Sequence, residues 1–91
     1  MQPAHLALSD VIHPSQIRAA RALLRISQSS LAELSGIGLA TIKRLEIAPD
    51  GFRGNVRTFL RIQNALELKG IVFIDEDGTY GPGVRFKKPS P

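Results

Sequence analysis

The spacing of apolar residues predicts four helices followed by two strands. The first helix begins at Pro14, because proline is well tolerated in the first turn of a helix. Its apolar residues form one stripe that we expect to face a core, and its arginines lie outside that stripe. The stripe consists of Ile17, Ala20, Leu23 and Leu24, and the arginines are Arg18, Arg21 and Arg25.

Two shorter helices are predicted on either side of a turn that contains glycine. Ser27 is placed to cap the first of them, and Gly36 follows its end, where the backbone commonly turns left-handed. Gly38 is then the N-cap of a second short helix that starts at Leu39. The apolar positions are Leu31, Ala32 and Leu34 before the turn, and Ile37, Ile42 and Leu45 after it.

A longer helix is predicted after a turn formed by Pro49, Asp50 and Gly51. Asn55 is a good N-cap for this helix, and Gly70 lies at its end. Its apolar residues cover more than one stripe, so we expect the helix to pack on two sides. These residues are Val56, Phe59, Leu60, Ile62, Leu66 and Leu68.

After Gly70 the pattern changes to that of a β-hairpin. Residues 71–74 are β-formers on both faces, and Asp77 with Gly78 marks a turn before a returning strand. One face of the first strand can cover the helices, while the other needs either a second subunit or its own chain as a cover. We expect the hairpin to form a homodimer through Ile71, Val72, Phe73, Ile74, Val84 and Phe86, with the apolar residues of the longer helix before it as the alternative interface.

The fold class is therefore mainly α, with four helices and a C-terminal β-hairpin. We divide the chain into a flexible segment (1–13), a helical domain (14–70), the hairpin (71–86) and a flexible tail (87–91). A chain of 91 residues makes one small domain, without room for a deep catalytic cleft. It contains no cysteine, and its N-terminus lacks the charged region of a signal peptide, so we expect a cytoplasmic protein.

The segment QSSLAELSGIGLATIKRLE, residues 28–46, contains a set of residues at characteristic spacing. Gln28 opens a helix, Ala32 follows four positions later, Gly36 closes the helix, and a later apolar pair comes next. In this set the chain resembles the Cro and phage-repressor family of helix-turn-helix proteins, the XRE-like group, over roughly residues 15–70. The resemblance implies a compact, lambda-repressor-like domain that binds double-stranded DNA. The apolar pair is Ile42 and Leu45.

Basic side chains are concentrated in the helical part of the chain. The formal net charge is +4, and residues 14–70 contain nine Lys or Arg against four Asp or Glu. Such a surface is suited to face phosphates, although an ordinary solvated helix surface explains the same charge pattern.

A recognition helix starting at Leu39 would present its first turn to base edges in the major groove. Lys43 is the first choice for reading a guanine, with a plain phosphate contact as the alternative. Leu39 and Ala40 are aliphatic, so they can contact only a thymine methyl or exclude other bases. Thr41 and Arg44 complete the predicted set.

Contacts to the DNA backbone are predicted around this helix. Gln28 and Ser29 open the preceding helix, whose N-terminal amides suit a phosphate, although Ser29 is equally suited to ordinary capping. The resemblance also implies that Gln28 helps to position the recognition helix. Glu46 would repel phosphate if exposed, so we expect it to pair with an arginine of the first helix or of a loop. The resemblance implies a further backbone clamp at Arg53, Asn55 and Arg57, of which Arg57 fits a solvated face as well.

No set of residues predicts an enzyme, a metal site or a cofactor. His5 and His13 have no carboxylate arranged beside them, and residues 75–78 lack the ligand spacing of a calcium loop. Gly36 and Gly38 are not followed by the third glycine of a dinucleotide-binding loop.

These observations predict a dimeric transcriptional regulator of the repressor type that binds a short palindromic DNA site. The alternative is a protein-interaction module on the same fold, such as an antitoxin or an adaptor that binds a protein partner. Neither interpretation involves a membrane.

Overall fold

The predicted order of elements is confirmed by a computed structural model, which describes residues 11–52 and 54–89. Within these residues the chain forms four helices and an antiparallel pair of strands. The elements are α1 (Pro14–Leu24), α2 (Gln28–Ser35), α3 (Leu39–Ile47), α4 (Val56–Leu68), β1 (Ile71–Ile74) and β2 (Gly83–Phe86).

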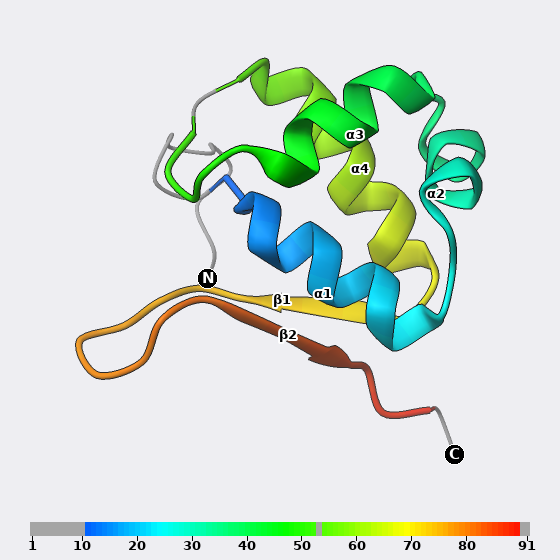
Figure 1. Cartoon of the computed structure of the whole chain (residues 1–91). Coiled ribbons are helices and arrows are strands. Elements are labelled where there is room, and N and C mark those ends of the chain that lie inside the picture. Colours follow the sequence, from blue (N-terminus) through cyan, green and yellow to red (C-terminus); the bar gives the residue numbers. More distant parts are fainter. Residues whose placement is uncertain (1–10, 53, 90–91) are drawn as a thin grey trace.

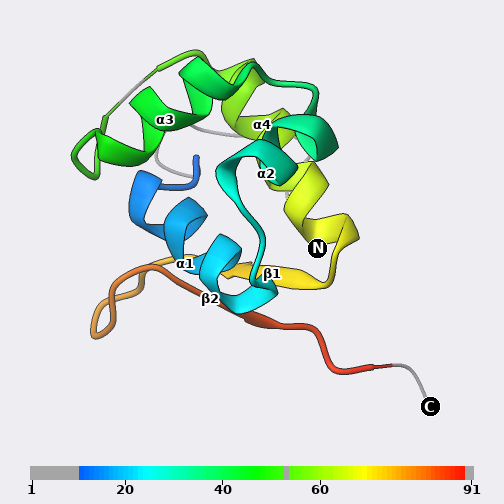
Figure 2. The same ribbon diagram turned by 45° about the vertical axis from the view of Figure 1, so that its right-hand side comes forward.

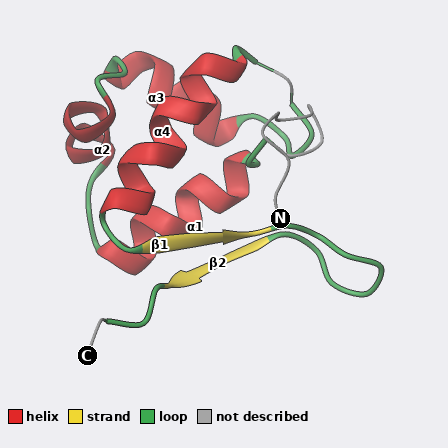
Figure 3. Ribbon diagram, turned by 180° about the vertical axis from the view of Figure 1, so that it is seen from behind, coloured by secondary structure: helices red, strands yellow, loops and turns green. Residues whose placement is uncertain are grey.

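The elements are arranged so that α1 lies between α3 and the hairpin (Figures 1 and 2). α3 packs on α1 and α2, whereas β1 packs on α4 and β2 packs on α1. Seen from behind, α4 runs down the molecule and leads directly into β1 (Figure 3). The hairpin and α3 therefore lie on opposite sides of the domain, a placement that the order of elements along the chain did not reveal.

The helix boundaries follow the predicted caps. Ser27 Oγ accepts a hydrogen bond from the backbone N–H of Ser30 at 3.0 Å, and Asn55 Oδ1 accepts one from the N–H of Arg57 at 2.9 Å. Gly36 ends α2 with a left-handed backbone, at a φ of 72°. These caps satisfy amides and carbonyls that a helix end leaves without an intrahelical partner, so they fix where α2 and α4 begin and where α2 ends.

The core is built from buried apolar positions of all four helices and of β1. Ile17 of α1, Leu31 of α2 and Ile42 of α3 are completely buried, and α4 adds three large side chains to them. Ile71 of β1 is also buried in this core. The further buried apolar residues are Ile12, Ala20, Leu45, Phe59, Ile62, Ala65, Leu66 and Ile71.

Two predicted apolar stripes are wrong in one position each, for the same geometric reason. Leu23 is 38% exposed and Leu68 is 88% exposed. Each lies six residues after a buried isoleucine, which places it about 120° away around the helix. Leu24, which completes the stripe on α1, does pack against the core.

The folded part of the chain begins earlier than the predicted boundary at residue 14. Ile12 is buried, and His13 is the N-cap of α1. The backbone N–H of His13 donates to Gln16 Oε1 at 2.7 Å, which closes a capping box with that side chain. The predicted flexible segment therefore does not extend to residues 11–13, and residues 1–10 lie outside the described part of the chain.

One face of the hairpin is covered by the helices of the same chain. In the register of the two strands, Ile71 lies opposite Phe86 and Phe73 lies opposite Val84. Ile71 is buried, and Phe73 and Val84 pack against the core. Gln16 binds α1 to the end of the hairpin next to its turn, because its Nε2 donates to the carbonyl of Gly83, the first residue of β2, at 3.0 Å.

The backbone at Gly36 provides a test of the turn between α2 and α3. We expect Gly36→Val to lower the free energy of unfolding by about 1 to 3 kcal/mol, because a β-branched residue is strained at positive φ. A Cβ at this position would also lie 2.6 Å from Arg61 Nη2. Gly36→Asn is the matched control, since it adds the same Cβ but tolerates a left-handed backbone, and it should cost less. Urea denaturation of the three proteins gives the comparison, and equal stability of the Val and Asn variants would contradict it.

Candidate nucleic-acid interface

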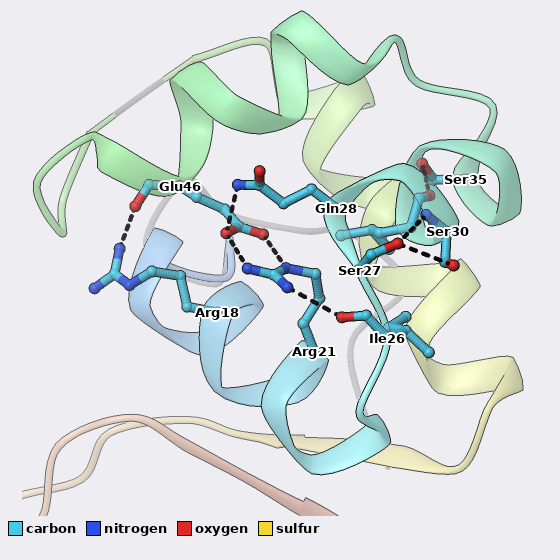
Figure 4. Close-up of polar contacts among 9 residues, drawn as sticks. Arg18, Arg21, Ile26, Ser27, Gln28, Ser30, Ser35 and Glu46 are labelled. Carbon is cyan, nitrogen blue, oxygen red and sulfur yellow. Dashed lines mark hydrogen bonds and ion pairs between the residues drawn. The ribbon is translucent and has the colours of Figure 1, made fainter.

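Glu46, near the end of α3, connects the first three helices through its buried carboxylate (Figure 4). Arg21 of α1 approaches it with two nitrogens, Nε at 2.7 Å from Oε2 and Nη2 at 2.8 Å from Oε1. Gln28 of α2 donates to Oε1 from its Nε2 at 3.1 Å. The predicted pairing of Glu46 with an arginine of the first helix is therefore confirmed.

Further hydrogen bonds extend this network to the backbone. Arg18 donates from Nη1 to the carbonyl of Glu46, and Arg21 donates from Nη1 to the carbonyl of Ile26 at 3.0 Å. The position of Arg18 and Arg21 outside the apolar stripe of α1 did not indicate these bonds. Both arginines hold α3 against α1, and Arg21 also holds the α1–α2 turn.

The network also sets the ionisation of its members. Burial by itself would raise the pKa of the Glu46 carboxyl, but the hydrogen bonds from Arg21 and Gln28, together with the charges of Arg21 and Arg18, lower it below the ordinary glutamate value. The hydrogen bond to Glu46 likewise raises the pKa of Arg21. The carboxylate is therefore charged at neutral pH, yet its charge is directed inward and is neutralised there.

The outward face of α3 consists of residues spaced three and four apart. Ala40, Lys43, Arg44 and Ile47 are all exposed, and Ile47 reaches 84% exposure. Because the acidic side chain of this helix is buried, the exposed face carries two positive charges and no negative one. Because α3 packs on α1 and α2 through its buried residues, this exposed face is turned away from them. α1 separates α3 from the hairpin (Figure 1).

Two further predicted base-contacting residues lie at the margins of that face. Leu39 and Thr41 are half-buried, on opposite sides of Ala40. The hydroxyl of Thr41 accepts a hydrogen bond from Arg44 Nη2 at 3.3 Å, so it orients that guanidinium. Of the predicted set, Lys43, Arg44 and Ala40 are thus the side chains most open to a ligand.

Some of the residues predicted to contact phosphate make hydrogen bonds within the fold, and others are exposed to solvent. Gln28 is half-buried and bound to Glu46, and Asn55 uses its side-chain oxygen to cap α4. Ser29 and Arg57 are exposed at the first turns of α2 and α4. Arg53 lies outside the described residues. Gln28 thus connects the first turn of α2 to Glu46 of α3.

The loop between α3 and α4 is fastened to the start of α1. Ser15 donates from Oγ to Asp50 Oδ2 at 2.6 Å, and the N–H of Gly51 donates to His13 Nδ1 at 3.1 Å. The hydrogen bond from Ser15 lowers the pKa of the Asp50 carboxyl. The part of the loop next to Phe52 is therefore held at a defined distance from α1.

A hollow that the sequence did not predict adjoins the exposed face of α3. It has a volume of about 470 Å³ and lies between the second half of α3, the following loop and the first turns of α4. Ile47 and Phe52 flank it, and Phe52 is 43% exposed. We refer to it as the α3–α4 hollow. The only available signal in the sequence was the position of Ile47, seven residues after Ala40 and hence on the same side of the helix.

The residues predicted to form a dimer are only partly accessible. Ile71, Phe73 and Val84 face the helices of their own chain. Ile74 is 37% exposed on the outer face of the sheet, and Phe86 is 52% exposed at the end of β2. Any contact with a second subunit through the hairpin would thus rest on the outer face or on the edges of the sheet.

Comparisons with known proteins add no assignment: no protein-family model matches the chain, and no curated protein matches it. Among the described residues, no group of three or more His, Asp or Glu side chains could hold a metal ion. None of the helices within residues 11–52 and 54–89 is long and apolar enough to cross a membrane.

The Glu46 network predicts a particular dependence of stability on pH. Because the pKa of Glu46 is lower in the folded than in the unfolded chain, its contribution is present above the ordinary glutamate pKa of about 4.3 and is lost as the pH falls through the folded value. We expect acidification from pH 6 towards pH 3 to destabilise the native protein more than Glu46→Gln, because the variant lacks this titration. Denaturation midpoints across that range provide the measurement, and parallel curves would contradict it.

The same network predicts an asymmetry between single and double substitutions. Arg21→Met leaves the buried Glu46 without its cation and should cost about 3 kcal/mol at neutral pH. The double variant Arg21→Met with Glu46→Leu removes both charges and should be more stable than Arg21→Met alone. A double variant that is less stable than either single variant would mean that the two charges do not act as a pair.

Proposed function

We propose that the protein is a sequence-specific DNA-binding regulator of transcription, and that α3 enters the major groove. The observation that supports this most directly is the outward face of α3. It presents Lys43 and Arg44 to solvent, while the acidic residue of the same helix, Glu46, is buried and neutralised. A helix whose exposed face carries only cations and uncharged side chains suits a groove lined by phosphates and by the acceptor atoms of bases.

The surroundings of α3 support the same proposal. The helix contains 9 residues, and an α-helix with its side chains is about 10 to 12 Å in diameter, which fits a major groove about 12 Å wide. Ser29 and Arg57 are exposed in the first turns of α2 and α4, and helix N-termini favour bound phosphate. Asn55 and Arg44 line one hollow, so the start of α4 is close to the exposed face of α3.

We infer a dimer that places two copies of α3 on one side of the DNA. One small helix-turn-helix unit makes few contacts, and two units bind adjacent turns of a palindrome with their recognition helices about 34 Å apart. The outer face of the hairpin is directed away from α3, so stacking two such faces would turn the two α3 helices in opposite directions. Pairing along an edge of the hairpin keeps both helical layers on one side of the joined sheet, and we therefore favour the edge of β2 near Phe86.

A protein partner is the second candidate, and the α3–α4 hollow favours it. Ile47 and Phe52 expose large apolar side chains beside a concave surface, which is a common feature of protein interfaces. An antitoxin or an adaptor would use such a surface to bind its partner. The two candidates differ in what the exposed face of α3 contacts, so DNA binding separates them.

Site selection from random DNA, followed by affinity measurements over a range of salt concentrations, tests the proposal. We expect an enriched palindrome with half-site centres about 10 base pairs apart and binding that weakens steeply with salt. The absence of both enrichment and salt-sensitive retention would contradict DNA binding and favour the protein partner.

Substitutions on α3 and α4 should separate base reading from phosphate contact. Lys43→Ala should relax the preference at one base pair of each half-site and cost about 1 to 3 kcal/mol, whereas Arg57→Ala should weaken all sequences alike and lower the salt slope by about one. Arg85→Ala is the matched control, because this cation is exposed on the opposite side of the domain. An unchanged base preference in Lys43→Ala, measured on single-base variants of the site, would remove Lys43 from base reading.

The orientation of the hairpin predicts which of its substitutions affect association. Val72→Asp with Ile74→Asp alters the outer face and should leave the dimer intact, whereas Phe86→Asp alters the edge of β2 and should weaken it. Sedimentation at tens of micromolar gives the oligomeric state. A monomeric native protein would contradict the inferred dimer, and dissociation by the outer-face pair alone would show that the faces, not the edges, associate.

A further inference from the structure

The side chains on the exposed face of α3 fall into an ordered pattern. Ala40 and Ile47 are seven residues apart, so they lie on nearly the same line along the helix. Lys43 and Arg44 lie between them, one on either side of that line. The exposed face therefore has an aliphatic centre with one cation on each flank.

Ile47 is a strongly exposed apolar residue of this face. Its 84% exposure exceeds that of most apolar side chains in the described chain, and it belongs to the same surface as the two cations. Its side chain makes no contribution to the buried core, in which Ile42 and Leu45 of the same helix take part. Stability of the fold thus does not require an isoleucine at this position, whereas a ligand on this face would contact it.

The chemistry of the face restricts which base edges it can recognise. Lysine and arginine donate hydrogen bonds, which suit the O6 and N7 acceptors of guanine. Aliphatic side chains fit the C5-methyl group of a pyrimidine. Adenine is typically read by Asn or Gln and the amino group of cytosine by Asp or Glu, and none of these residue types is exposed on α3.

We propose that α3 selects DNA by C5-methyl groups of pyrimidines that lie beside guanines, with Ala40 and Ile47 as the two methyl-contacting residues. This inference rests on the proposed function and specifies its substrate. Seven residues correspond to a rise of about 10.5 Å along the helix, which is longer than the step of about 3.4 Å between base pairs. The two methyl contacts therefore lie on different base pairs of each half-site.

The C5-methyl group has two sources in DNA, thymine and 5-methylcytosine, and one experiment distinguishes them. The full chain is bound to a selected duplex and to versions in which single thymines are replaced by deoxyuridine, which lacks only the methyl group. A parallel series replaces single cytosines by 5-methylcytosine. Loss of one buried methyl should weaken binding about fourfold, at two different base pairs of each half-site.

Substitution of Ile47 connects the methyl effect to a residue. Ile47→Ala should weaken binding severalfold and abolish the sensitivity to one of the two methyl groups. The thermal unfolding temperature of the protein should not change, because the Ile47 side chain is exposed. Ile74→Ala is the matched control, because it removes the same atoms from the outer face of the hairpin, and it should alter neither affinity nor methyl sensitivity.

The outcomes separate this inference from the function on which it rests. Weakening by deoxyuridine assigns the methyl groups to thymine, and tightening by 5-methylcytosine alone assigns them to methylated cytosine. Specific binding that responds to neither series, or an unchanged methyl response in Ile47→Ala, overturns the inference while the proposed function stands. A complete lack of specific DNA binding overturns both.

Discussion

The buried carboxylate of Glu46 is the interaction on which the arrangement of the helices depends. It receives hydrogen bonds from Arg21 of α1 and Gln28 of α2, while Arg18 binds the carbonyl of the same residue. A buried charge that loses its partner is strongly destabilising, so α3 has one favourable position against α1 and α2. The network also withdraws the negative charge of α3 from solvent, and the same contacts that orient the helix therefore determine the positive sign of its exposed face.

The position of the hairpin limits how two copies of the chain can act together. α1 lies between α3 and the strands, and Gln16 of α1 bonds to the carbonyls of Ile74 and Gly83 at the far end of the hairpin. The hairpin is thus fixed on the side of the domain opposite to α3. Its outer face cannot bring two α3 helices to the same side of a ligand, whereas its edges can, because joining edges preserves the direction in which each helical layer points.

The features that the sequence predicts well are local, and those it misses depend on distant contacts. The caps at Ser27 and Asn55 and the left-handed Gly36 require only the neighbouring backbone, so residue type was sufficient to locate them. The pairing of Glu46 with an arginine could be anticipated, because an exposed acid on this helix would repel phosphate. The exposure of Leu68 could not be anticipated, because it depends on how α4 is rotated about its axis in the core. The role of Gln16 could not be anticipated either, because its two hydrogen bonds reach residues that are 58 and 67 positions further along the chain.

We propose that the exposed face of α3, held by Glu46, is the surface that binds DNA. Nuclear magnetic resonance of the uniformly labelled chain during titration with its selected duplex tests this claim most directly. We expect the largest amide shifts on residues 39–47 and on the first turns of α2 and α4, and little change on the outer face of the hairpin. Shifts confined to the hairpin, or the absence of any shift on α3 under conditions where the duplex binds, would contradict it.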